Sequence, residues 1–228
     1  MSGLLSGRLV AGAVAAVLAT AGAGTAQGTG GVTGVVSAAP VKLAPIRVTI
    51  DPRVCGDELP DESILVGATG ALANAVVTLV GVTARPNAGD ITIVNEGCRF
   101  VPRVQVVRPK ALVHATSSDP MLHTTQALTP SGETLFNLAL PVPGINIARP
   151  LNDPGVVHVA CNIHQWMRGW VIVTDDEAAV TGPDGRFTLP NVPPGTYELR
   201  VWHEALEAAP RKVTVVAGKP IDVVVQMK

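Results

Sequence analysis

From Val32 onward the chain reads as strands rather than helices, because it consists largely of short runs of β-branched residues separated by turn residues. The runs are IRVTI (46–50), AVVTLVGV (75–82), DITIVN (90–95), RVQVV (103–107), ALVHATSS (111–118), VVHVAC (156–161) and WVIVT (170–174). Val and Ile at this spacing favour strands, while 19 Pro and 23 Gly interrupt any long helix. The one helical turn that we expect lies in DELPDESI (57–64). The pattern predicts an all-β chain, and strands with one apolar face indicate a β-sandwich, in which a second sheet covers that face.

The N-terminal residues 1–26 have the features of a secretory signal. Arg8 is the only charge, an apolar run follows it, and small residues precede an expected cleavage site near Ala26. An uncleaved anchor is the alternative, but the apolar run is short for a bilayer. We therefore expect an exported protein, periplasmic or extracellular, with no membrane span in its mature form. Residues 27–44 read as a low-complexity lead-in, with GVTGVV as a possible first strand.

The net charge excludes one large class of partner. The chain has a formal charge of −1, which becomes −2 without Arg8, and it has no basic stripe. Proteins that bind nucleic acid neutralise phosphates with clustered Lys and Arg. We therefore expect no nucleic-acid partner.

An exported chain with three Cys needs an explanation for the odd one. Cys55 and Cys98 share one context, since each lies beside turn residues and near an expected strand. We therefore predict a Cys55–Cys98 disulfide, which would stabilise the fold by about 4 kcal/mol. Cys161 is then a free thiol in an oxidising compartment, and we expect something to protect it.

The motif CNIHQWM (161–167) offers soft ligands at three-residue intervals. Alternation along the preceding strand directs Cys161 inward, and His164 and Met167 follow in a turn that can fold back on itself. Two His, one Cys and a weak Met form the ligand set of a blue-copper site. The second His must come from elsewhere, and His123, which we expect in a loop after the strand 111–118, is the best candidate.

Two segments resemble the small cupredoxins: ALVHATSSDPMLHTT (111–125) and PGVVHVACNIHQWM (154–167), whose CxxHxxM spacing is similar to that of amicyanins. This resemblance implies a Greek-key β-sandwich over residues 45–174 and one type 1 copper ion. It assigns the ligands to His123, Cys161, His164 and Met167. It also assigns a supporting role to Thr124, where the family usually has Asn, and to Asn162. Gln165 stands where Pro is common.

The C-terminal residues 175–228 resemble a different family. DGRFTLPNVPPGTYELRVW (184–202) and VTVVAGKPIDVVV (213–225) are similar to carboxypeptidase regulatory-like, or prealbumin-like, β-sandwich modules. About fifty residues make a thin core, so we expect this module to dock on the first domain. The whole chain resembles exported bacterial cupredoxin-domain proteins of the methylamine-utilisation-like kind.

The resemblance implies a function without catalysis, the transfer of single electrons between redox proteins. It further implies that the exposed edge of His164 is the electron port, within an apolar patch that docks partners transiently. The expected neighbours of this patch are Met121, Leu122, Pro143 and Trp166. A multicopper oxidase would need many more His in HxH pairs, and a nitrite-reductase-like enzyme would place His where this chain has Ala160.

Several alternatives remain open from the residues alone. Zinc suits Cys and His but leaves Met167 unused. Cys161 activated by His164 could be a nucleophile, although no motif marks an oxyanion hole. The same ligands could serve copper delivery or storage, and the tail could belong to a structural or carbohydrate-binding protein. His114, His158 and His203 read as strand or core residues rather than ligands.

Overall fold

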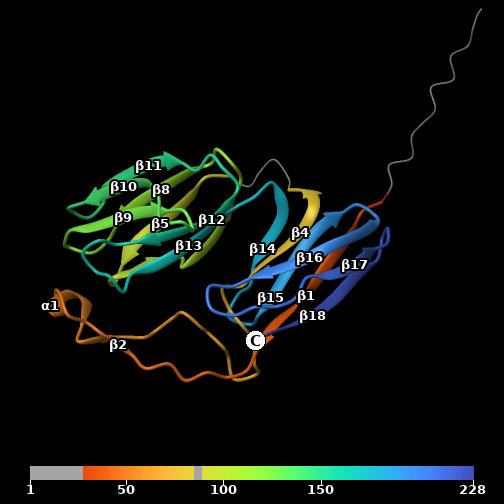
Figure 1. The fold of residues 1–228 in the computed structure, drawn as a ribbon, viewed down its shortest axis with the longest axis horizontal. Coiled ribbons are helices and arrows are strands. Elements are labelled where there is room, and N and C mark those ends of the chain that lie inside the picture. Colours follow the sequence, from red (N-terminus) through yellow and green to blue (C-terminus); the bar gives the residue numbers. More distant parts are fainter. Residues whose placement is uncertain (1–27, 85–88) are drawn as a thin grey trace, which may run out of the picture.

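The computed structural model describes residues 28–84 and 89–228, and it places two β-sandwiches side by side (Figure 1). The prediction of an all-β chain is confirmed: within these residues the only helix is the single turn α1 (Pro52–Cys55). No helix in the described ranges is long and apolar enough to cross a membrane. The expected signal, residues 1–26, lies outside the described residues.

The first sandwich consists of a five-stranded and a four-stranded sheet. The five-stranded sheet has the order β10 (Thr134–Leu140), β9 (His123–Leu128), β12 (Gly155–Ala160), β13 (Arg168–Val173) and β7 (Val104–Val107). The four-stranded sheet has the order β11 (Asn146–Pro150), β8 (Leu112–Ser117), β5 (Ile91–Glu96) and β6 (Arg99–Val101). Alternate residues of β12 point into the core between the sheets, with Val157 and Val159 buried and Cys161 continuing the same face.

The second sandwich uses strands from both halves of the chain. One sheet has the order β15 (Arg186–Val192), β1 (Gly30–Ala38) and β18 (Pro220–Met227). The other has the order β14 (Asp176–Val180), β4 (Val76–Thr83), β16 (Gly195–Trp202) and β17 (Arg211–Val215). β1 and β4 lie inside their sheets rather than at an edge, and the side chains of Val32, Val36, Val77 and Leu79 are all completely buried in the shared core.

The domain boundaries therefore differ from the expected division at residues 45 and 175. Residues 30–38 form a central strand, which confirms the possible strand GVTGVV but not the loose lead-in around it, and β4 does not belong to the first sandwich. The physical reason is burial, because the C-terminal strands alone cannot cover their own apolar faces. The first sandwich is consequently inserted between β4 and β14 of the second.

A strap, residues 46–59, leaves the second sandwich and lies against the first. It contains β2 (Ile46–Arg47), α1 and β3 (Glu58–Leu59), and it runs below the first sandwich in Figure 1. The expected strand IRVTI is thus reduced to two residues, and the helical turn lies at Pro52–Cys55 rather than at residues 57–64. Pro in the first turn fits this start, since its missing N–H would have no helical partner there.

The predicted disulfide is confirmed. Cys55 and Cys98 are bonded with a Cα–Cα distance of 5.5 Å, and Cys161 is free and buried. The bond joins α1 to the turn between β5 and β6, and both Cys lie in a small apolar cluster with Val48 and Trp166. It thereby fixes the strap on the first sandwich.

The two sandwiches contact each other through apolar and charged side chains. The Trp170 and Trp202 rings meet edge to face with centroids 5.5 Å apart. Arg103 donates two hydrogen bonds to the Glu204 carboxylate, at 2.6 and 2.8 Å, and both side chains are largely buried. A bidentate pair of this kind favours one relative orientation of the two partners. The second sandwich is therefore docked on the first.

The central position of β1 can be tested with two glycines of the same strand. A Cβ at Gly34 would overlap the carbonyl oxygen of Val223 and the ring of Phe187, whereas a Cβ at Gly31 meets only the Leu189 oxygen at 3.7 Å. Gly34→Ala should lower the free energy of unfolding by about 3 kcal/mol, and Gly31→Ala should change it by less than about 0.5 kcal/mol.

Amide hydrogen exchange of the full protein measures this difference strand by strand. We expect Gly34→Ala to reduce protection in β15 and β18 but not in β9 and β12. Equal effects of the two substitutions, or a loss of protection confined to the first sandwich, would contradict the observed strand order.

Candidate metal centre

Two paired strands bring the candidate ligands together. His123 is the first residue of β9, not a loop residue as expected, and Cys161 directly follows β12. β9 and β12 are antiparallel, with Ala160 aligned to Gln126, so the end of one strand meets the start of the other. His164 lies in the turn of residues 161–167 that connects β12 to β13. Strand pairing thus positions two of the ligands and the turn positions the third.

The nitrogen and sulfur atoms of these three residues converge. His123, Cys161 and His164 offer ligand atoms that all lie within 4.8 Å of one another. The two Nδ1 atoms are 3.1 Å apart, and His164 Nδ1 is 3.8 Å from Cys161 Sγ. The exposed fraction is 0% for both His and 3% for Cys161. The cluster is therefore closed to solvent.

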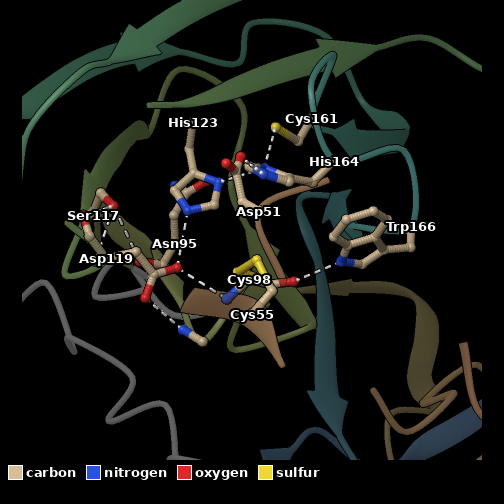
Figure 2. The surroundings of a disulfide bond; sticks show 11 residues. Asp51, Cys55, Asn95, Cys98, Ser117, Asp119, His123, Cys161, His164 and Trp166 are labelled. Atoms are coloured by element: carbon tan, nitrogen blue, oxygen red, sulfur yellow. Dashed lines mark hydrogen bonds and ion pairs between the residues drawn. A yellow bond between two sulfur atoms is a disulfide. The ribbon is translucent and has the colours of Figure 1, made fainter. Parts of the chain in front are cut away.

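The outer nitrogen of each imidazole contacts a carboxylate. His123 Nε2 lies 2.9 Å from Asp119 Oδ2, and His164 Nε2 lies 3.0 Å from Asp51 Oδ2 (Figure 2). An ionised carboxylate only accepts, so each Nε2–H must donate. In a neutral imidazole this leaves the Nδ1 lone pair free.

Two lone pairs therefore face each other across 3.1 Å beside a sulfur atom. Such an arrangement repels itself unless a cation lies between the donors, because both nitrogens are acceptors. Metal-binding His usually donate their other N–H to a carboxylate in the same way. The donor set therefore fits a metal ion.

The environment of Cys161 favours the thiolate form of its side chain. Burial raises its pKa, but the contact with the His123 side chain and hydrogen bonds from the backbone N–H groups of His164, Thr124 and Ile163 lower the pKa more, to about 5. Cys161 is therefore largely a thiolate at neutral pH, which is the form that binds metals.

Thr124 links the ligand turn to β9. Its backbone N–H and its hydroxyl both lie near Cys161 Sγ, at 3.4 and 3.6 Å, and the hydroxyl accepts a 2.8 Å hydrogen bond from the Asn162 N–H. The threonine thus supplies donors to the thiolate and an acceptor to the turn. Asn162 takes part through its backbone rather than its side chain.

Met167 belongs to the core beside the cluster. Its side chain is 1% exposed and packs in the same apolar group as Cys161, and its N–H donates to the His164 carbonyl at 2.8 Å. This hydrogen bond closes the turn. The role of the thioether as a weak fourth ligand stays a prediction.

The expectation of an exposed His164 edge is wrong. The ring is 0% exposed, Asp51 of the strap accepts from its Nε2–H, and the Trp166 ring lies 5.2 Å away between centroids. The strap covers the position where the cupredoxin resemblance implies a solvent-facing imidazole. Of the expected patch residues, Leu122 is 46% exposed, whereas Met121 packs on the cluster of Cys55 and Cys98.

Sequence reasoning missed both carboxylates. Asp119 lies four residues before His123, and this spacing could have suggested it as a partner. Asp51 is 113 residues away from His164 in the sequence, and no local pattern connects the two. The second group of possible metal ligands in the described chain, Cys98, Asp119 and His123, includes a sulfur already used in the disulfide.

The remaining His lie outside the cluster. His114 contacts Asn146 at 3.1 Å on the surface of β8, and His158 packs on Trp170 with centroids 4.5 Å apart. His203 is buried and its Nδ1 accepts from the Ala205 N–H at 3.2 Å. Each has the strand or core role that the sequence indicated.

Comparison with protein families supports the resemblance of the C-terminal module. Residues 171–228 match the family model of the carboxypeptidase regulatory-like domain, which confirms the expected identity of the C-terminal module. No curated protein sequence matches this chain.

The solved structures that are similar include several cupredoxins. A purple cupredoxin from Nitrosopumilus maritimus is 22% identical, with a TM-score of 0.34 over 37% of this chain and 100% of its own. Amicyanin from Paracoccus versutus is 17% identical, with a TM-score of 0.34 over 43% and 97%. A copper-containing nitrite reductase from Thermus scotoductus is 18% identical, with a TM-score of 0.32 over 57% and 28%. At such low scores, the ligand assignment depends on the residues of this chain alone.

The contribution of Thr124 can be measured in metal-free protein. Thr124→Val removes the hydroxyl donor to Cys161, so the thiolate is less favoured and its pKa should rise by about one pH unit above its present value of about 5. The ultraviolet absorbance of the thiolate as a function of pH reports this change.

Thr124→Ser is the matched control because it keeps the hydroxyl, and it should leave the pKa close to that of the original protein. A folded Thr124→Val protein with an unchanged thiolate titration would show that the hydroxyl does not support the sulfur.

Proposed function

We propose that this protein binds one copper ion through His123, Cys161 and His164, with Met167 as a weak fourth ligand, and carries single electrons. The observation that carries this proposal is the convergence of two buried Nδ1 atoms, 3.1 Å apart, on the buried sulfur of Cys161. Two imidazoles, a thiolate and a thioether are the donor set that copper prefers in electron-transfer sites.

The donor types favour copper over the other cations. A proton could bridge the two nitrogens, but it would leave the thiolate without a role. Zinc binds Cys and His, yet divalent copper binds such nitrogen and sulfur donors more tightly than zinc in the general order of metal affinities. Copper, unlike zinc, would also use the thioether of Met167 as a weak ligand.

Burial opposes a nucleophilic function for Cys161. A substrate carbonyl must approach within about 3.5 Å of a nucleophile. Cys161 is 3% exposed and both His are 0% exposed, so no substrate group reaches the sulfur in this conformation. The alternative of Cys161 as a catalytic nucleophile is therefore poorly supported, and we propose a protein without catalytic activity.

The rigid frame suits electron transfer. Copper supplies the one-electron chemistry, while β9, β12 and the turn hold the donors in place through the Thr124 and Met167 hydrogen bonds. Ligands that do not move when the charge changes lower the energy needed for reorganisation. We propose that redox proteins dock transiently on the exported protein, in the periplasm or outside the cell.

Copper storage or delivery is the second candidate, and one observation favours it. His164 has no exposed edge, and a fully buried centre exchanges metal and electrons more slowly than an open one. A carbohydrate-binding role has less support, because Trp202 packs on Trp170 at the contact between the sandwiches rather than forming a free platform.

Absorption and electron paramagnetic resonance of the copper(II)-loaded protein test the proposal. We expect an intense thiolate-to-copper band in the visible region and narrow hyperfine splitting, both lost in Cys161→Ser and strongly altered in His164→Gln. His114→Gln is the matched control, since His114 lies on β8 away from the cluster, and it should leave both spectra unchanged.

A colourless copper complex, or one whose spectra survive Cys161→Ser, would contradict the proposed site. If the spectra are as expected, the rate of electron exchange with a small inorganic redox reagent separates the two candidates. Fast exchange supports an electron carrier, and exchange slower than copper loss supports storage.

A further inference from the structure

The Asp51 side chain does not cap the helix that it precedes. It is the N-cap residue of α1, where an Asp carboxylate usually accepts a hydrogen bond from the first turn of the helix. Asp51 makes no such bond, and its backbone adopts the left-handed conformation, with φ of 55°. This conformation is uncommon for residues other than Gly and often marks a functional constraint. The carboxylate instead contacts His164 Nε2.

Cys98 connects the outer partners of both candidate His ligands (Figure 2). Its N–H donates to Asp119 Oδ2 at 2.9 Å, and the same oxygen accepts from His123 Nε2–H. Its carbonyl accepts from Trp166 Nε1–H at 3.2 Å. Its sulfur is bonded to Cys55, the last residue of α1, four residues after Asp51. Cys98 thus connects Asp119, the partner of His123, with the segment that carries Asp51, the partner of His164.

The carboxylates of Asp119 and Asp51 are held in different ways. Asp119 belongs to the first sandwich, and the N–H groups of Gly97 and Cys98 fix its two oxygens at 2.8 and 2.9 Å. Asp51 belongs to the strap, and its side chain is 47% exposed although the imidazole beneath it is 0% exposed. The carboxylate of Asp51 therefore separates His164 from solvent, and the disulfide is the covalent bond that keeps this part of the strap in place.

We propose that the strap, residues 46–59, is a cover for the metal centre, that Asp51 is a positioning residue for His164, and that the Cys55–Cys98 disulfide holds the cover closed. The cover fixes the imidazole with Nδ1 toward the centre and retains the bound metal ion. This inference deepens the proposed function, because it assigns the path by which metal and solvent reach the ligands. Its test starts in metal-free protein, so that failure of the copper proposal and failure of the cover are distinguishable.

The first measurement is the alkylation rate of Cys161 by iodoacetamide in the metal-free full chain. With the disulfide intact, Cys161 is the free thiol of the described chain, so the rate reports access to the centre. We expect Cys55→Ser/Cys98→Ser to react at least about 10-fold faster, since opening of a region governs access to its buried groups. Asp57→Ala is the control, because it removes an exposed carboxylate from the same strap, and its rate should be unchanged.

The second measurement is the tautomer of each His by nitrogen NMR in the same metal-free protein. Asp51→Ala should remove the fixed Nε2–H form of His164 and leave that of His123, whose partner is Asp119. Asp51→Asn should keep the His164 tautomer, because the amide oxygen still accepts a hydrogen bond. A purely structural role for Asp51 predicts no such rescue and no difference between the two imidazoles.

The third measurement is copper loss to a copper(I) chelator. Replacing the outer partner of a metal ligand costs about 10- to 100-fold in affinity, so Asp51→Ala and the disulfide variant should lose copper faster by that factor. The proposal of a cover would be contradicted if Cys161 of the disulfide variant were alkylated no faster than that of the unaltered protein and the His164 tautomer were unchanged in Asp51→Ala. Altered alkylation and tautomers in a protein that binds no copper would retain the cover and overturn the copper proposal.

Discussion

The hydrogen bonds from the two imidazoles to carboxylates are the interaction on which the rest of the site depends. Asp119 and Asp51 each accept an Nε2–H, and this fixes the orientation of both rings. Without that orientation the rings could rotate, and the lone pairs would not converge on Cys161. Each carboxylate also places negative charge near the centre, which favours a cation there. The burial of the donors then prevents water from satisfying them.

Three separate parts of the chain supply this arrangement. The first sandwich provides the candidate ligands at the meeting ends of β9 and β12, the strap provides Asp51, and the disulfide joins the strap to the sandwich. The strap can reach the centre because the preceding strand, β1, anchors it in the second sandwich. The regulatory-like tail is therefore part of the framework that holds the cover, since it supplies the strands on both sides of β1.

Local patterns predicted the candidate ligands that converge in the structure, and long-range contacts decided what the sequence did not show. Alternation in β12 and the spacing from Cys161 to Met167 lie within one strand and one turn, so both are readable from the residues. The contact between the strap and His164 could not be predicted from the residues, because Asp51 lies far away in the sequence and its segment has the pattern of an ordinary turn. β4 and β1 were assigned incorrectly for the same reason: Val-rich strands indicate burial but not which sheet they join.

The parallel pairing of β1 with β18 aligns Gly31 with Pro220, so one edge of β1 stays unpaired until the last described strand is synthesised. The first sandwich has all its strands between them and can close while β1 still lacks a partner. During this interval β1 is an apolar strand with an open edge, the kind of segment that recruits strands from other chains. A chain cut short before β18 would leave that edge of β1 open, so β18 protects the fold from such pairing as well as completing its core.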